Sequence, residues 1–152
     1  MADKKNKPRP VSASLPEMGR VPPQAIDMEE AVLGAIMLEK EAIITVIDIL
    51  KPDSFYKDVH QKIYAAIIAL NLRELPVDLY TVTEELRSND ELDNVGGPVY
   101  LTQLTSKVVS AAHVEFHAKI VAQKFIQREL IRVTSEIQGR AFDDSNDINE
   151  LL

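Results

Sequence analysis

The stretch KIVAQKFIQRELIRVTSEI, Lys119 to Ile137, contains neither glycine nor proline and mixes charged with apolar residues throughout. This composition predicts a helix. A helix on the surface of a globular domain normally gathers its apolar residues on the one side that faces the core. At about 100° per residue, the apolar residues here fall on more than one side. The stretch therefore predicts a helix with more than one packing partner.

On a helical wheel, the apolar residues of this helix and its flanks form three lines. The first line covers the first half of the helix. The second covers the second half and is turned by about a third of the circumference. The third recurs every eleven residues and belongs to neither. The first line is Val114, Ala118, Val121 and Phe125; the second is Ile126, Leu130, Val133, Ile137 and Ala141; the third is Ile120, Ile131 and Phe142.

The length of this helix decides which lines a single chain can cover. A helix over residues 111–142 would extend about 48 Å, whereas a compact head of about 100 residues has a radius of gyration near 13 Å. The first line can pack on such a head. We expect the second to pack on a helix that starts in DDSNDINELL, residues 143–152, and folds back as a hairpin. The third line then predicts an interface with another chain, and ordinary isolated surface residues are the alternative.

Five shorter segments upstream also have helical apolar spacing, and turn or cap residues mark their ends. Asp27 is the expected N-cap of the first, with Glu30 as its capping-box acid, and Asp58 and Asp78 are expected caps of the third and fourth. We see no convincing strand alternation. The predicted fold class is all-α: a compact multi-helix head followed by a projecting helical hairpin whose second helix is truncated. The five segments are residues 27–38, 40–50, 58–73, 77–89 and 93–108.

Charge and composition divide the chain further. Residues 1–23 contain five prolines and carry a net charge of +3. Since the whole chain carries −7, residues 24–152 carry −10. We expect a disordered basic arm over residues 1–23, a head over 24–110, and the long helix with the start of the hairpin over 111–152. Such an acidic folded part predicts little or no direct nucleic-acid binding. The absence of cysteine, of an apolar run of about 18 residues and of a signal peptide favours a cytoplasmic protein without a membrane span.

Residue patterns for enzyme chemistry are weak. No Gly-Lys pair exists to build a phosphate loop, and the two glycines before Pro98 predict a turn that starts a helix. His113 and His117 have a spacing that suits a metal, but a third ligand is not evident. His60 has no acid at a useful spacing and is interpreted as structural. We therefore predict no catalytic, cofactor or metal site in this chain.

Five strings in order resemble the N-terminal domain of the bacterial replicative DNA helicase of the DnaB type. Each string alone is weakly specific, but five in sequence with little gapping are highly specific. The resemblance covers residues 21–152. The strings are VPPQAIDMEEAVLGAIM, DSFYKDVHQKIYAAI, PVDLYTVTEEL, ELDNVGGPVYLTQL and KIVAQKFIQRELIR.

This resemblance implies a globular helical head followed by a helical hairpin. In that family the hairpins pair two subunits, and contacts between heads close a ring that is a trimer of dimers. The ring docks the C-terminal domain of primase, contributes to loader contacts, and caps a motor that uses ATP and Mg²⁺ to move 5′ to 3′ along single-stranded DNA. The chain ends at Leu152, where the second hairpin helix starts. The resemblance therefore implies a fragment of a helicase that lacks the motor.

Carried over by position, the primase-facing surface of the family falls at Asp27, Tyr100, Ile131 and Ile137. Ile131 also belongs to the third line. For Ile137 the alternative is a place in the hairpin core, and for Tyr100 it is a half-buried structural role. The candidate residues for binding primase or another subunit are Asp27, Tyr100, Ile120, Ile131, Ile137 and Phe142.

Two other functions remain open from the residues. One is a free-standing helical adaptor, similar to the helicase-binding domain of primase, which resembles this domain in fold. The other is a small enzyme, which the lack of a nucleophile, a metal cluster or a cofactor loop disfavours.

Overall fold

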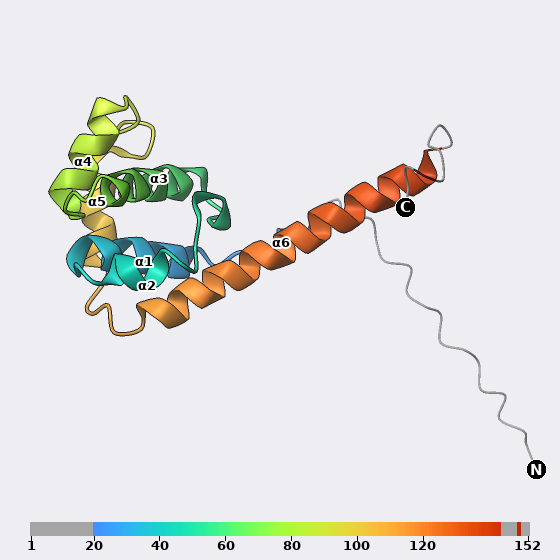
Figure 1. Cartoon of the computed structure of the whole chain (residues 1–152), viewed down its shortest axis with the longest axis horizontal. Helices are drawn as coiled ribbons and strands as arrows, with labels where there is room; N and C mark the ends of the chain where they lie inside the picture. The colour runs from blue at the N-terminus through green and yellow to red at the C-terminus, as the bar shows by residue number, and fades with distance from the viewer. Residues whose placement is uncertain (1–19, 144–148, 150–152) are drawn as a thin grey trace, which may run out of the picture.

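The computed structural model describes residues 20–143 and residue 149 of the chain, and every regular element among them is a helix (Figure 1). The predicted all-α class is therefore confirmed. In chain order the elements are α1 (Ile26–Leu38), α2 (Ala42–Val46), the short 3-10 helix η1 (Pro52–Ser54), α3 (Asp58–Leu72), α4 (Leu79–Ser88), α5 (Gly97–Ser106) and α6 (Val114–Phe142).

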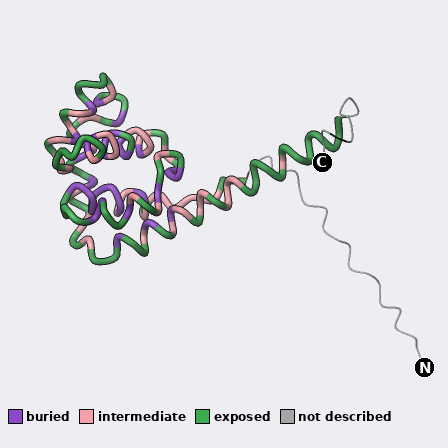
Figure 2. Tube along the Cα trace, viewed as in Figure 1, coloured by how far each residue is buried: buried purple, intermediate pink, exposed green. Residues whose placement is uncertain are grey.

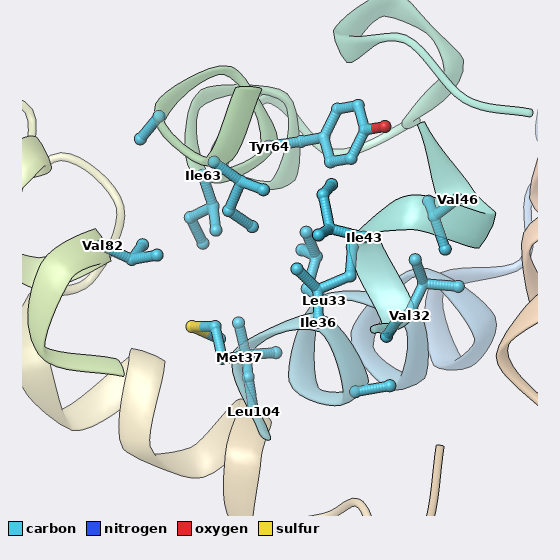
Figure 3. Close-up of a cluster of buried hydrophobic side chains, with 14 of the residues drawn as sticks. Val32, Leu33, Ile36, Met37, Ile43, Val46, Ile63, Tyr64, Val82 and Leu104 are labelled. Atoms are coloured by element: carbon cyan, nitrogen blue, oxygen red, sulfur yellow. The ribbon is translucent and has the colours of Figure 1, made fainter. Parts of the chain in front are cut away.

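Helix α1 lies at the centre of the head, the part formed by residues 24–110, and contacts α2, α3, α4, α5 and α6. Most of its residues from Glu29 to Met37 are buried, because other helices surround it. Its apolar side chains meet Ile43 and Val46 from α2, Ile63 and Tyr64 from α3, Val82 from α4 and Leu104 from α5 (Figure 3). Such burial of large aliphatic side chains provides the main driving force for folding.

A close approach of two helices explains Gly34 on α1. A Cβ atom at this position would lie 2.2 Å from the carbonyl oxygen of Leu104 and 2.6 Å from Cγ2 of Val108. Glycine is therefore required where α1 crosses α5, since any larger residue would push the two backbones apart.

The predicted N-caps have different outcomes. Asp78 caps α4, because its carboxylate accepts the N–H of Thr81 at 2.9 Å. The predictions for Asp27 and Asp58 are wrong, since α1 begins at Ile26 and α3 begins at Asp58 itself. Both acids lie in a first turn, where a carboxylate interacts favourably with the helix dipole without capping it.

Glu30 does not complete a capping box with Asp27. Its carboxylate instead accepts from the Lys107 ammonium at 2.6 Å, just after the end of α5. This ion pair ties the start of α1 to the end of α5, across 77 residues of sequence. The turn before α5 is as predicted, with positive φ angles of 105° at Gly96 and 72° at Gly97.

Helix α6 has 29 residues, a length of about 43 Å, and only its first half packs on the head (Figures 1 and 2). Val114, Ala118 and Val121 are buried against the head, as expected for the first line, and Phe125 is half-buried. None of the described residues from 126 to 143 is buried. The projecting rod is therefore present, whereas the predicted return helix of the hairpin, in residues 143–152, falls almost wholly outside the described residues.

None of the helices in the described part of the chain is long and apolar enough to cross a membrane.

Candidate protein-docking surface

The projecting half of α6 exposes the second and third apolar lines. Ile131 is 43% exposed, Ile137 is 60% exposed and Phe142 is 80% exposed. Ile126, Leu130 and Val133 of the second line are also exposed. Ile120 differs, because it lies on the half of α6 beside the head and is half-buried. Exposed apolar side chains aligned along a helix usually mark an interaction surface.

A groove lies at the base of this rod, where α6 leaves the head. Its volume is about 920 Å³. The chain before α1, the η1 loop, the start of α3 and the middle of α6 form its walls. Its lining residues are Arg20, Val21, Pro22, Pro23, Lys51, Asp53, Phe55, Tyr56, Gln61, Phe125, Arg128, Glu129, Ile131 and Arg132.

Arg128 fastens α6 to the head beside this groove. Its Nη1 donates to the carbonyl oxygen of Pro23 at 2.8 Å, and its Nη2 donates to that of Ser54 at 2.9 Å. Its guanidinium also lies over the rings of Tyr56, at 5.4 Å, and Phe125, at 5.8 Å. Because the guanidinium fork is planar and rigid, these contacts fix the direction in which α6 projects.

A buried polar network lies inside the head. The Glu29 carboxylate is 2.8 Å from Nδ1 of His60, and Nε2 of His60 is 2.6 Å from the Tyr100 hydroxyl. Glu29 also accepts the backbone N–H groups of Tyr56, at 2.8 Å, and Lys57, at 3.4 Å. Glu29 is 1% exposed and His60 is 0% exposed. With the ring proton on Nδ1, His60 donates to Glu29 and accepts from Tyr100, so that every member has a partner.

The sequence interpretation of His60 was wrong in one respect. His60 is structural, as expected, but it does have a partner acid, which lies 31 residues upstream. A signal was available, because Glu29 occupies the same helical face as the buried Val32 and Leu33, three and four residues further on. An acid on an apolar face indicates a buried partner.

The hydroxyl of Tyr100 points into this network, and its ring stacks on that of His60 at a centroid distance of 6.1 Å. Burial, together with the nearby Glu30 and Glu29 carboxylates, raises the pKa of Tyr100 to about 12. Burial alone raises the pKa of Tyr64 to about 12, and its hydroxyl donates to the carbonyl oxygen of Leu50 at 2.9 Å.

These two pKa shifts predict a loss of stability at high pH. Both tyrosines hold their protons above the ordinary pKa of 10.0 when folded. Their contribution to stability is therefore constant below pH 10 and decreases as the pH rises from 10 to about 12. Absorbance titration at 295 nm of the chain and of its Tyr64→Phe and Tyr100→Phe variants should assign two late ionisations. A Tyr100→Phe variant that removes no ionisation near pH 12 would contradict the shift.

The six predicted binding residues do not form one pocket. Asp27 is exposed on the first turn of α1, and Tyr100 is half-buried in the head with its hydroxyl engaged. Only Ile131 lines the groove, whereas Ile137 and Phe142 lie further out on α6. The groove itself was missed, because its walls come from segments that are distant in sequence.

His113 and His117 lie close together, with ring centroids 6.4 Å apart. In the described residues, no group of three or more His, Cys, Asp or Glu side chains is placed to hold a metal ion. This pair therefore has no third ligand within that part of the chain.

Comparison with known proteins gives a consistent assignment. The profile of the DnaB-like helicase N-terminal domain matches residues 21–123. Among curated relatives, the replicative DNA helicase DnaB of Rhodothermus marinus is 49% identical over 136 residues, which are 90% of this chain and 14% of that protein. The replicative DNA helicase DnaC of Bacillus subtilis is 46% identical over 133 residues, which are 88% of this chain and 29% of that protein.

Solved structures agree with the observed fold. The N-terminal domain of DnaB helicase from Mycobacterium tuberculosis superimposes with a TM-score of 0.82 at 36% identity, covering 86% of this chain and 92% of that one. A DnaB-like replicative helicase, solved in a study of its interactions with primase, matches with a TM-score of 0.68 at 30% identity, over 76% of this chain and 27% of that one. The chain thus spans less than a third of the length of the helicases of Rhodothermus and Bacillus.

Proposed function

Because this chain belongs to the DnaB-like helicase N-terminal domain family, we propose that it is the oligomerisation and primase-docking domain of a replicative DNA helicase. The observation that carries this proposal is the projecting half of α6, which exposes two apolar lines beside a groove. An apolar surface of this kind is costly in water unless another chain covers it.

The two lines have different roles in this proposal. The second line, from Ile126 to Ile137, would pack on the returning helix of the hairpin, and the hairpins of two copies would pair in a dimer that assembles into a trimer of dimers. Ile131 of the third line and Ile137 on α6, with Asp27 and Tyr100 on the head, would face the C-terminal domain of primase. Support for a primase partner comes from the DnaB-like helicase whose structure was solved in a study of its interactions with primase.

The remaining activities of such a helicase would reside outside this chain. A motor domain in the rest of the protein would bind ATP and Mg²⁺ and unwind DNA at the replication fork in the bacterial cytoplasm, and a helicase loader would contact the assembled ring. Within this chain, the proposed division is an arm over residues 1–23, the head over 24–110 and the hairpin region over 111–152.

The Ile131→Asp variant tests the docking function. Placing a charge in an apolar contact leaves that charge desolvated and unpaired, so we expect the affinity for the C-terminal domain of the cognate primase to decrease by about 1–3 kcal/mol, or about 5-fold to 150-fold. Isothermal titration calorimetry measures this change. Since the Ile131 side chain is 43% exposed, the thermal midpoint should change little.

Leu72→Asp is the matched control, because Leu72 is an exposed apolar residue on α3, outside the groove and α6. This variant should bind the primase domain as the wild type does. Equal weakening by both variants would indicate a non-specific charge effect. Light scattering of the same samples measures the oligomeric state and so tests the proposed oligomerisation. A chain that stays monomeric at every concentration and also fails to bind the primase domain would refute the proposal.

A further inference from the structure

The groove at the base of α6 concentrates positive charge on an otherwise acidic chain. Its lining includes four cationic residues, Arg20, Lys51, Arg128 and Arg132, but only two acids, Asp53 and Glu129. The whole chain carries a net charge of −7. This local excess of positive charge therefore contrasts with the net charge of −10 that residues 24–152 carry.

Three of the four cations form no direct ion pair with a carboxylate in the described residues, although Lys51 and Arg128 lie close enough to Glu129 to help lower the pKa of its carboxyl. Within the described residues, neither Arg20 nor Lys51 forms an ion pair with a carboxylate. Arg128 donates only to the neutral carbonyl oxygens of Pro23 and Ser54. Arg132 is the exception, because it pairs with Glu129 at 2.9 Å and with Glu136 at 3.4 Å.

Aromatic rings contact two of these cations, Lys51 and Arg128. The Lys51 ammonium lies 5.2 Å from the centre of the Phe125 ring, and the Arg128 guanidinium lies over both Tyr56 and Phe125. Such contacts orient a cation without neutralising its charge. The half-exposed Ile131 adds an apolar position to the same wall. The groove thus offers fixed positive charges beside an apolar surface.

We propose that this groove binds an acidic peptide segment of a docking partner, with carboxylates at Arg20, Lys51 and Arg128 and an apolar side chain against Ile131. The inference rests on the proposed docking function and adds the chemistry of the segment that docks. Carboxylates form strong charge-assisted hydrogen bonds with arginine and lysine. The groove volume of about 920 Å³ is within the range of ligand sites.

A protein segment fits this groove better than a nucleic acid does. Single-stranded nucleic acids bind by stacking their bases on open aromatic faces along a positive channel. Here the Lys51 and Arg128 cations already lie over the Phe125 and Tyr56 rings.

The direct test uses a short fluorescein-labelled synthetic peptide that alternates Asp or Glu with Leu. Two control peptides of the same length carry Asn and Gln, or Lys, in place of the acids. Fluorescence anisotropy should show that the acidic peptide binds at least about tenfold more tightly than either control, and that salt weakens this binding. Amide chemical-shift changes should map to residues 51–56 and 125–132. Equal binding of the acidic and neutral peptides, or shift changes elsewhere, would overturn the proposal.

Charge reversal then identifies the cations. Lys51→Glu and Arg20→Glu should each lower the affinity for the acidic peptide by about tenfold, since a repulsive contact replaces an attractive one. Lys40→Glu is the matched control, because Lys40 is exposed between α1 and α2 and outside the groove. All three positions are exposed, so the fold should persist. Equal weakening by Lys40→Glu would overturn the proposal, because it would show a general charge effect.

Other occupants give distinct results. Displacement of the peptide by an oligothymidine of matched charge would assign the groove to nucleic acid, and loss of peptide binding as the protein concentration rises would assign it to a second copy. Either result overturns the proposal. If the primase domain binds and Ile131→Asp weakens it while the acidic peptide fails to bind, only this inference fails. If the primase domain does not bind at all, the docking function fails, whatever the peptide does.

Discussion

Replacing Glu29 with alanine should lower the free energy of unfolding by about 3 kcal/mol, the upper end of the cost of leaving a buried hydrogen-bond donor without its acceptor. The Glu29 carboxylate is the common acceptor for His60 Nδ1 and for the backbone N–H groups of Tyr56 and Lys57. Without it, the Nδ1–H of His60 would remain buried without a partner, because His60 is fully shielded from water, and the two part-buried backbone N–H groups would also lose their acceptor. Denaturation in urea, followed by circular dichroism at 222 nm, measures the loss.

Glu30→Ala provides the control for this prediction. Glu30 is the neighbouring acid in α1, but its ion pair with Lys107 is partly open to water, because the lysine side chain is 60% exposed and the Glu30 side chain is 14% exposed. An ion pair of this type contributes about 1 kcal/mol or less. We therefore expect Glu30→Ala to lower the free energy of unfolding only slightly and Glu29→Ala to lower it strongly. A similar loss of stability in both variants would contradict the prediction, because it would show that the buried hydrogen bonds of Glu29 contribute no more than the ion pair of Glu30.

The second large effect is expected for Gly34→Ala. A methyl group at this position would lie 2.2 Å from the Leu104 carbonyl oxygen, a backbone atom that no side-chain rotation can move away. Helices α1 and α5 would have to separate, which would loosen the packing of Leu104 and Val108. Overpacking of a core typically costs about 1–3 kcal/mol, and the backbone clash places this variant at the upper end. The decrease in the thermal midpoint measures it.

Gly139→Ala introduces the same atom on the same type of element. Gly139 lies in the exposed part of α6, and an added Cβ there has no neighbour within 4 Å. Alanine favours a helix over glycine by about 0.5–1 kcal/mol, so this variant should be no less stable than the wild type. Wild-type stability of Gly34→Ala would mean that α1 and α5 do not cross at the observed separation.

The spacing of apolar residues along the chain was enough to predict the all-α class, the long helix α6 and several of the helices before it. The three apolar lines of α6 were readable because a helix repeats every 3.6 residues, so a contact with the head at Val121 and exposure at Ile131 are encoded within one segment. The Asp78 cap and the turn at Gly96 were equally local, since each depends on residues within four positions. Cap placement failed at Asp27 and Asp58 because a first-turn acid and an N-cap acid have similar local sequences.

Only the tertiary structure decided which distant residues meet. His60 lies 31 residues from Glu29 and 40 from Tyr100, and no periodicity relates such positions. The groove required the chain near Arg20, the η1 loop and α6 to converge, with Arg128 joining them through two carbonyl oxygens. The sequence by itself therefore determined the helices and the exposed lines of α6, because these depend on local spacing. The buried network, the glycine crossing and the charged groove depend on packing between segments, which only the folded chain establishes.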